Sequence, residues 1–264
     1  MIYYNQGDYT RASENYAKTL KIELAALGEN HPNVAMSYNN IGGIYYIHGD
    51  YTHALEFFKK ALRIYLAAIG ENHQVVAVSY NNIGAVYDSQ GDYAHALEHY
   101  EKALKIRLAI FGKKHPDIAK SYNNIGIVYH SQGDYVQALE NYEKALKIQL
   151  ETLGEKHPDV ASSYNNIGGV YDSQSDYSCA LEYVKKALNI WLATLGENHP
   201  AVATSYNNIG GIYHHHGDYT HALEYYEKAL QMMLKFVGED HPNVKTIKKN
   251  ISDVKEDLTA KQPK

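Results

Sequence analysis

Five pairs of adjacent asparagines are the residues of this sequence best suited to chemistry. They recur every 42 residues, at Asn39 and Asn40, Asn81 and Asn82, Asn123 and Asn124, Asn165 and Asn166, and Asn207 and Asn208. An asparagine amide offers donor hydrogens and an acceptor oxygen, so a row of amides can hold a peptide backbone without requiring a particular peptide sequence. The pairs therefore predict a peptide-binding ladder. The alternative is that one asparagine of each pair braces the neighbouring repeat.

Two acidic residues and two histidines lie one helical turn beyond the asparagines in successive repeats. These are Asp88, His130, Asp172 and His214. Because the ordinary pKa of histidine is about 6.5, this set should become more positive as the pH falls through that value. We expect these residues to tune binding, with neutral or weakly basic peptides favoured at neutral pH and acidic peptides gaining below it. The alternative is that they are solvated helix ends without a ligand.

The sequence offers no catalytic or metal-binding group of comparable strength. The run His214-His215-His216 resembles a metal site, but consecutive residues of a helix point in different directions and do not converge on one ion. Cys179 is a lone thiol, and the repeat places no base beside it. We therefore predict no catalytic residue, no metal and no cofactor, and expect that the chain is not an enzyme.

The asparagines belong to a longer motif that predicts a helical hairpin. In the first full repeat, Pro32 suits the start of a helix and Gly49 its left-handed end, and Asp50 suits the N-cap of a second helix. We expect a first helix at about 32–48 and a second at about 51–69. The histidines that precede most of the helix-starting prolines are interpreted as structural, with a capping role. A fixed period of this length is typical of a solenoid, in which each unit buries its apolar face on the next.

The repeat boundaries predict one array. We expect a truncated repeat at 1–30, a capping helix at 241–258 and a disordered tail at 259–264. The five full repeats are 31–72, 73–114, 115–156, 157–198 and 199–240.

The two ends of the array differ from its middle. Residues 2–4 align with residues 44–46, so about half of the first helix is expected to be missing, as in a fragment of a longer protein. In the cap, Lys248 and Lys255 replace tyrosines of the repeat, which is typical of a polar helix that closes an array.

The repeat resembles the tetratricopeptide repeat (TPR). The residues that carry the resemblance are Tyr38, Ile41, Gly42, Tyr45, Ala54, Phe58 and Ala61. The linking segment 153–161, of sequence LGEKHPDVA, resembles the TPR domain of kinesin light chains, and the likeness covers about residues 1–251. It implies an all-α, right-handed α-solenoid of stacked antiparallel helix pairs, with the first helices lining the concave face.

By this resemblance, the function is a non-enzymatic protein-interaction scaffold that binds a peptide or a helix in its groove. The alternative is a structural module that self-associates through its repeat ends or convex surface. Kinesin light chains hold acidic, aromatic-centred cargo motifs with basic groove residues, whereas Lys120 is the only lysine on this face before the cap. The cargo motif of kinesin light chains is therefore not predicted here.

Composition narrows the choice of partners. The net charge of −5 gives no electrostatic case for nucleic acid or an anionic membrane. There is no run of about 18 apolar residues and no apolar signal segment at the start of the chain. The single cysteine fits a reducing compartment, so a cytoplasmic location is expected. Most of the 26 tyrosines fall at fixed places in the repeat, which indicates a role in packing.

Overall fold

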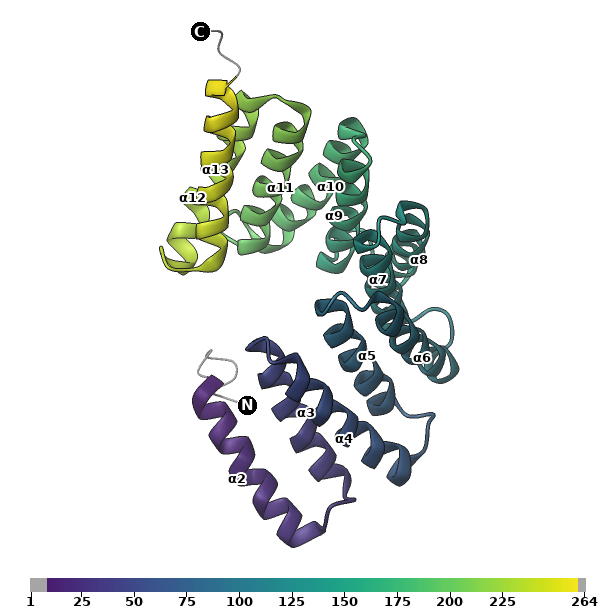
Figure 1. Cartoon of the computed structure of the whole chain (residues 1–264). Helices are drawn as coiled ribbons and strands as arrows, with labels where there is room; N and C mark the ends of the chain where they lie inside the picture. The colour runs from purple at the N-terminus through teal and green to yellow at the C-terminus, as the bar shows by residue number, and fades with distance from the viewer. Residues whose placement is uncertain (1–8, 261–264) are drawn as a thin grey trace. The chain divides into compact units, whose positions relative to one another are not determined.

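The computed structural model describes residues 9–260, which form helices joined by short turns (Figure 1). The second helices of the repeats are α2 (Tyr9–Leu27), α4 (Tyr51–Ile69), α6 (Tyr93–Phe111), α8 (Tyr135–Leu153), α10 (Tyr177–Leu195) and α12 (Tyr219–Val237). The first helices are α3 (Pro32–Ile47), α5 (Gln74–Ser89), α7 (Pro116–Ser131), α9 (Pro158–Ser173), α11 (Pro200–His216) and α13 (Pro242–Ala260). No strand occurs among these described residues.

The chain divides into two compact units, Met1–Val128 (unit 1) and Tyr129–Lys264 (unit 2). In unit 1, α3 packs on α4, α4 on α5 and α5 on α6. In unit 2 the same neighbour-to-neighbour packing runs from α8 to α13. The prediction of an all-α solenoid of stacked helix pairs is confirmed.

Side chains just outside the helices fix where they begin. The Nδ1 atom of His31 accepts a hydrogen bond from the backbone N–H of Asn33 across 3.2 Å, and His157 and His199 cap α9 and α11 in the same way. Asp50 is the N-cap of α4 and accepts from the backbone N–H of His53. These bonds satisfy N–H groups that a helix start leaves without a partner. The predicted capping role of the histidines is confirmed.

A glycine lies in the middle of each first helix from α3 to α11, and in α3 and α5 it allows the two helices of a pair to approach closely. A Cβ atom on Gly42 would lie 2.9 Å from the ring of Phe58, and one on Gly84 would lie 2.9 Å from the ring of Tyr100. Ala54 is fully buried on the partner helix. Glycine disfavours a helix by about 1 kcal/mol relative to alanine, and this packing offsets that loss.

The last helix differs slightly from the predicted cap. Val244, Ile247 and Val254 of α13 are buried, and α13 packs against α12, whereas Lys248 and Lys255 are exposed. The helix continues through Ala260, two residues past its predicted end, and the Thr259 hydroxyl donates to the Glu256 carbonyl in this last turn. The predicted tail was therefore wrong at residues 259 and 260. Its remainder, and the incomplete helix predicted at the start of the chain, lie outside the described residues.

Candidate functional site

Side-chain hydrogen bonds join the asparagines of one first helix to those of the next. In unit 1 the Nδ2 group of Asn82 donates to Oδ1 of Asn39 across 2.9 Å, which ties α5 to α3. Asn124 of α7 donates to Asn81 of α5 in the same way, across 2.8 Å. Each such bond between repeats is called a rung below.

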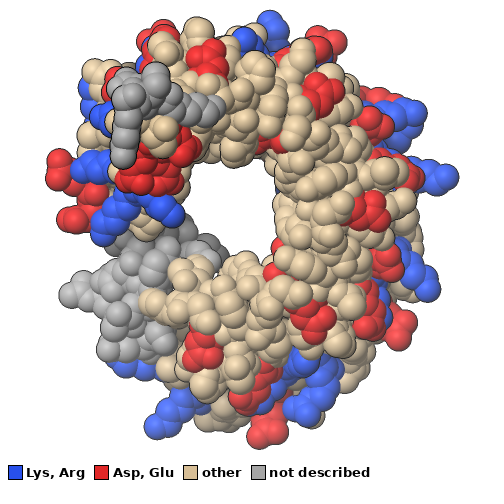
Figure 2. Space-filling view, turned by 45° about the horizontal axis from the view of Figure 1, so that its top comes forward, with Lys and Arg blue, Asp and Glu red and all other residues tan. Residues whose placement is uncertain are grey.

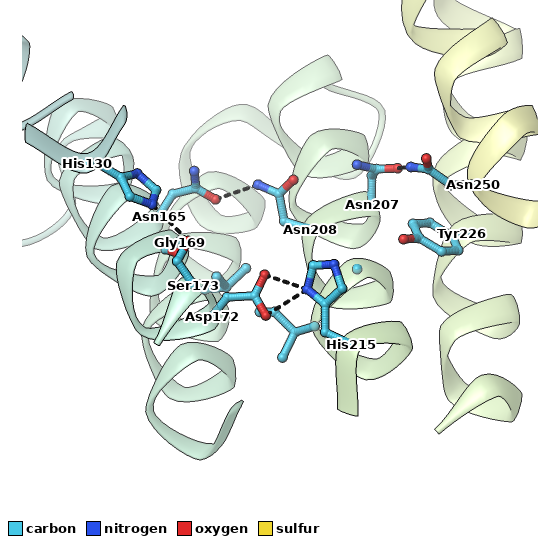
Figure 3. A pocket seen from close by; sticks show the side chains of 13 residues that line it. His130, Asn165, Gly169, Asp172, Ser173, Asn207, Asn208, His215, Tyr226 and Asn250 are labelled. Carbon is cyan, nitrogen blue, oxygen red and sulfur yellow. Dashed lines mark hydrogen bonds and ion pairs between the residues drawn. The ribbon is translucent and has the colours of Figure 1, made fainter. Parts of the chain in front are cut away.

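Unit 2 contains two further rungs. Asn208 of α11 donates to Asn165 of α9 across 2.8 Å. Asn250 of α13 donates to Asn207 of α11 across 3.1 Å (Figure 3). The bracing alternative is therefore present in the structure, and it uses both positions of the pair. The first asparagine accepts from the following repeat, and the second donates to the preceding one.

Each rung still has hydrogen-bonding capacity. An amide carries two donor hydrogens and an oxygen with two lone pairs, and a rung uses one hydrogen and one lone pair. In unit 2 the Nδ2 groups of Asn165 and Asn207 and the Oδ1 atoms of Asn208 and Asn250 make no other hydrogen bond with a described residue. All four residues are half-buried. The face that they form, called the asparagine face below, therefore presents donors and acceptors alternately.

A second line of side-chain bonds crosses unit 2 one turn beyond the rungs. The Nε2 atom of His130 lies 2.9 Å from the Ser173 hydroxyl. Asp172 accepts from Nδ1 of His215 across 2.9 Å, and Asp257 accepts from Nε2 of His214 across 2.8 Å. In unit 1, the hydroxyls of Tyr46 and Ser89 occupy the matching positions, 3.0 Å apart. Three of the four predicted tuning residues therefore contact a neighbouring helix and are not simply solvated helix ends.

Burial changes the titration of two of those four residues. Burial lowers the pKa of His130, and the nearby Asp172 carboxylate opposes this shift only in part. Burial raises the pKa of Asp88 in unit 1. The expectation that this set gains positive charge near the ordinary histidine pKa is therefore wrong for His130, whose protonation is displaced to lower pH because its charged form is poorly solvated.

The hydrogen bonds also determine which nitrogen of His130 carries the proton. The Ser173 hydroxyl donates to the backbone carbonyl of Gly169 across 3.0 Å. The Ser173 oxygen must then accept from His130, so Nε2 carries the proton and Nδ1 of the neutral ring is an acceptor.

A cavity of about 430 Å³ opens in unit 2 between the rungs and the second line of side-chain bonds (Figure 3). It is lined by His130, Asn165, Gly169, Asp172, Ser173, Val184, Asn207, Asn208, Gly211, Ile212, His215, Tyr226 and Asn250. Five of these are among the predicted site residues: His130, Asn165, Asp172, Asn207 and Asn208. Asp88, His214 and the remaining predicted asparagines do not line it.

Sequence reasoning missed several lining residues that carry a readable signal. Asn250 is the one asparagine of its pair that the last helix keeps, because Lys249 replaces the other. Val184 stands where the other full repeats have Phe58, Tyr100, Tyr142 or Tyr226. Both departures are visible when the repeats are aligned. Predicting a cavity also requires the distance between the helices, which the sequence does not give.

Charge is distributed unevenly between the two kinds of helix. Lys102, Lys186 and Lys228 each pair with a glutamate one turn earlier on the same second helix. Figure 2 shows lysine, arginine and acidic side chains side by side on the face in view, and two of the first helices, α3 and α11, contain none of these residues. Lys120, on the first helix α7, pairs with Asp117 of the same helix at 3.6 Å.

Two further properties concern only the described residues. No group of three or more histidine, cysteine or acidic side chains is arranged there to hold a metal ion. His214 and His215, two residues of the histidine run, contact aspartates of different helices. None of the helices in this part of the chain has both the length and the apolar character needed to cross a membrane.

The fold and this repeating face define a known class of protein. The sequence profile of the tetratricopeptide repeat matches residues 1–67, 49–109, 75–151, 117–193, 179–235 and 206–261. The chain belongs to the tetratricopeptide repeat family, as the resemblance implied. No curated protein has significant sequence similarity to it.

Several solved structures share the fold. One is BtubC (BKLC) from P. vanneervenii, with a TM-score of 0.67 and 22% identity over 89% of this chain and 92% of that one. A Podosopora anserina putative kinesin light chain with nearly identical TPR-like repeats has a TM-score of 0.63 and 22% identity over 78% and 98% of the two chains. The apo form of RapI has a TM-score of 0.65 and 19% identity over 89% and 95%. The identities support the fold alone.

Proposed function

We propose that the chain is a non-enzymatic scaffold that binds an extended segment of another protein along its asparagine face. The observation that carries this proposal is the unused donor and acceptor that each rung of unit 2 retains beside its inter-repeat bond. A helical ligand has already paired its backbone N–H and C=O groups, whereas an extended segment exposes both. The rungs therefore favour the extended ligand over the helical one.

The spacing of the rungs suits such a ligand. Packed helices lie about 8–10 Å apart, and an extended chain advances about 3.3 Å per residue. Successive rungs would then meet about every third residue of the ligand. Because backbone groups are the same in every residue, this mode tolerates varied sequences. The single cysteine fits a cytoplasmic setting for the interaction.

The test begins with a peptide selected from a random library against the whole chain. Its affinity is then measured for the double variant Asn165→Asp and Asn207→Asp. An aspartate oxygen still accepts the rung bond from Asn208 or Asn250, but the free donor hydrogens are gone. We expect affinity to fall at least tenfold with unchanged helicity. The matched control replaces the exposed Asn189 and Asn198 with aspartate, which adds the same charge away from the asparagine face.

Two results would contradict the proposal. One is equal affinity of the rung variant and the parent chain for the selected peptide. The other is a mass in sedimentation that rises with protein concentration while no peptide is selected, which would favour the self-association alternative.

A further inference from the structure

The cavity of unit 2 exists because one repeat departs from the pattern. Position 184 is valine, whereas the equivalent residues Tyr142 and Tyr226 are tyrosines. In the next repeat, the Tyr226 hydroxyl lies 3.5 Å from where a Cβ atom on Gly211 would be. By the equivalence of the repeats, a tyrosine at 184 would place its hydroxyl against Gly169, which lines the cavity. Val184 ends short of that space. The resulting volume, about 430 Å³, is within the range of sites that bind small groups.

The polar part of the cavity has several free hydrogen-bond acceptors beside the Nδ2 donors of Asn165 and Asn207. Asp172 contributes a carboxylate, whose two oxygens accept from His215 but keep further lone pairs. His215 donates through Nδ1, so its Nε2 is an acceptor when the ring is neutral, as is Nδ1 of His130. Asn208 adds its free Oδ1. No lysine or arginine lines the cavity.

The lining of the cavity also includes buried apolar residues and a hydroxyl that has no partner among the described residues. Val184 and Ile212 are buried there. Tyr226 is only 3% exposed, its hydroxyl points toward the cavity in Figure 3, and it has no hydrogen-bond partner among the described residues. Asp253 of α13 adds negative charge near this tyrosine. Lys249, also on α13, is exposed and does not line the cavity.

We propose that this cavity binds an arginine side chain of the peptide that the rungs hold. An arginine has an apolar stem and a planar fork of five donors, which match the apolar lining residues and the acceptors of Asp172, His215 and His130. The inference rests on the proposed function, because the rungs position the peptide whose side chain enters the cavity. It adds a preference at one position of a ligand that is otherwise recognised through its backbone.

The test compares two capped, fluorescently labelled peptides of alanine and serine. One has a central arginine, and the other has citrulline, which keeps the shape and removes the charge. We expect the parent chain to bind the arginine peptide at least tenfold more tightly. The variant Val184→Tyr introduces the tyrosine that three other repeats have at this position. In this variant the preference for arginine should disappear, while the citrulline peptide should bind with the same affinity as to the parent chain. Asp172→Asn should lower the preference at least fivefold, and the equivalent Asp88→Asn in unit 1 should not.

The outcomes distinguish failure of the arginine site from failure of the rungs. Equal affinity of the two peptides for the parent chain would overturn the arginine site and leave the rungs supported. If the preference for arginine over citrulline persists in both Val184→Tyr and Asp172→Asn, the arginine binds elsewhere and the proposed arginine site is also overturned. Failure of both peptides to bind would count against the rungs and the cavity together.

Discussion

At the scale of single residues, Ser175 occupies a helix-ending position that favours glycine. It has a φ of +61°, and it is the one described residue other than glycine with a positive φ. The equivalent residues in the other full repeats are Gly49, Gly91, Gly133 and Gly217. The first helix ends at the equivalent position before Gly49, Gly91 and Gly133, and one residue later before Gly217. The left-handed conformation is unfavourable for a residue with a Cβ atom, and glycine removes that strain.

We expect Ser175→Gly to raise the free energy of unfolding by about 1 kcal/mol. The reciprocal variant Gly133→Ser should lower it by a similar amount. Urea denaturation followed by circular dichroism measures both. A stability unchanged in both variants would show that this conformation carries no strain.

Arg107 is a second residue whose environment is unfavourable. Its side chain is 7% exposed, Nη1 donates to the Ser121 hydroxyl across 2.6 Å, and Nε has no hydrogen-bond partner. Burial lowers the pKa of its guanidinium, and the charge of Asp117 opposes that shift. In the next repeat, Gln149 occupies this position and accepts from Ser163 across 2.7 Å.

Replacing Arg107 with glutamine should therefore keep the bond to Ser121 and remove a buried charge with an unpaired N–H. We expect the free energy of unfolding to rise by about 1–2 kcal/mol, since an unsatisfied buried donor costs about that much. Thermal and urea unfolding of the variant provide the measurement. A loss of more than 1 kcal/mol would mean that the guanidinium is well compensated in the folded chain.

At the scale of helices, neighbouring glycines of α3 have opposite roles. A Cβ atom on Gly42 would meet the ring of Phe58 at 2.9 Å, whereas one on Gly43 would meet nothing within 4 Å. Gly42→Ala should destabilise the chain by about 1–3 kcal/mol through overpacking. Gly43→Ala should stabilise it by up to about 1 kcal/mol through helix propensity. Melting curves of the two variants test the contrast, and destabilisation of both by the same amount would contradict it.

Helices also differ in how firmly packing holds them. Between Asn15 and Leu27, α2 has no fully buried residue, whereas α10 buries Ala180, Val184 and Trp191. Local opening should therefore require less free energy in α2. We expect the amide hydrogens of α2 to exchange at least tenfold faster than those of α10, measured by mass spectrometry of peptic fragments. Equal protection of the two helices would contradict this expectation, unless sedimentation shows that another molecule covers α2.

At the scale of the whole molecule, the sequence predicted the helices far better than their contacts. Proline, histidine, aspartate and glycine recur at the ends of the helices, and each acts locally, so their positions gave the boundaries to within one or two residues. The partner of a side chain depends instead on which helix lies opposite and how far away it is. For this reason Asn165 could be assigned to an exposed face, but its bond to Asn208 could not be predicted.

The cavity shows the same limit. Val184, Gly169 and Gly211 come from three different helices, and each is unremarkable within its own helix. Only their packing in unit 2 combines a short side chain with two missing Cβ atoms. The aspartate and histidine that face this space were predicted as tuning groups, but their bonds to neighbouring helices were not.

Binding of the ligand backbone by the free side-chain amides of the rungs can be tested most directly by nuclear magnetic resonance. The ¹⁵N-labelled chain is titrated with the library-selected peptide, and the side-chain NH₂ signals of Asn165 and Asn207 are followed. Asn189 and Asn198, exposed and away from the asparagine face, provide the reference. We predict that the first two signals shift in proportion to bound peptide while the reference signals do not. Saturation by the peptide with no shift at Asn165 or Asn207 would show that these amides do not bind the ligand.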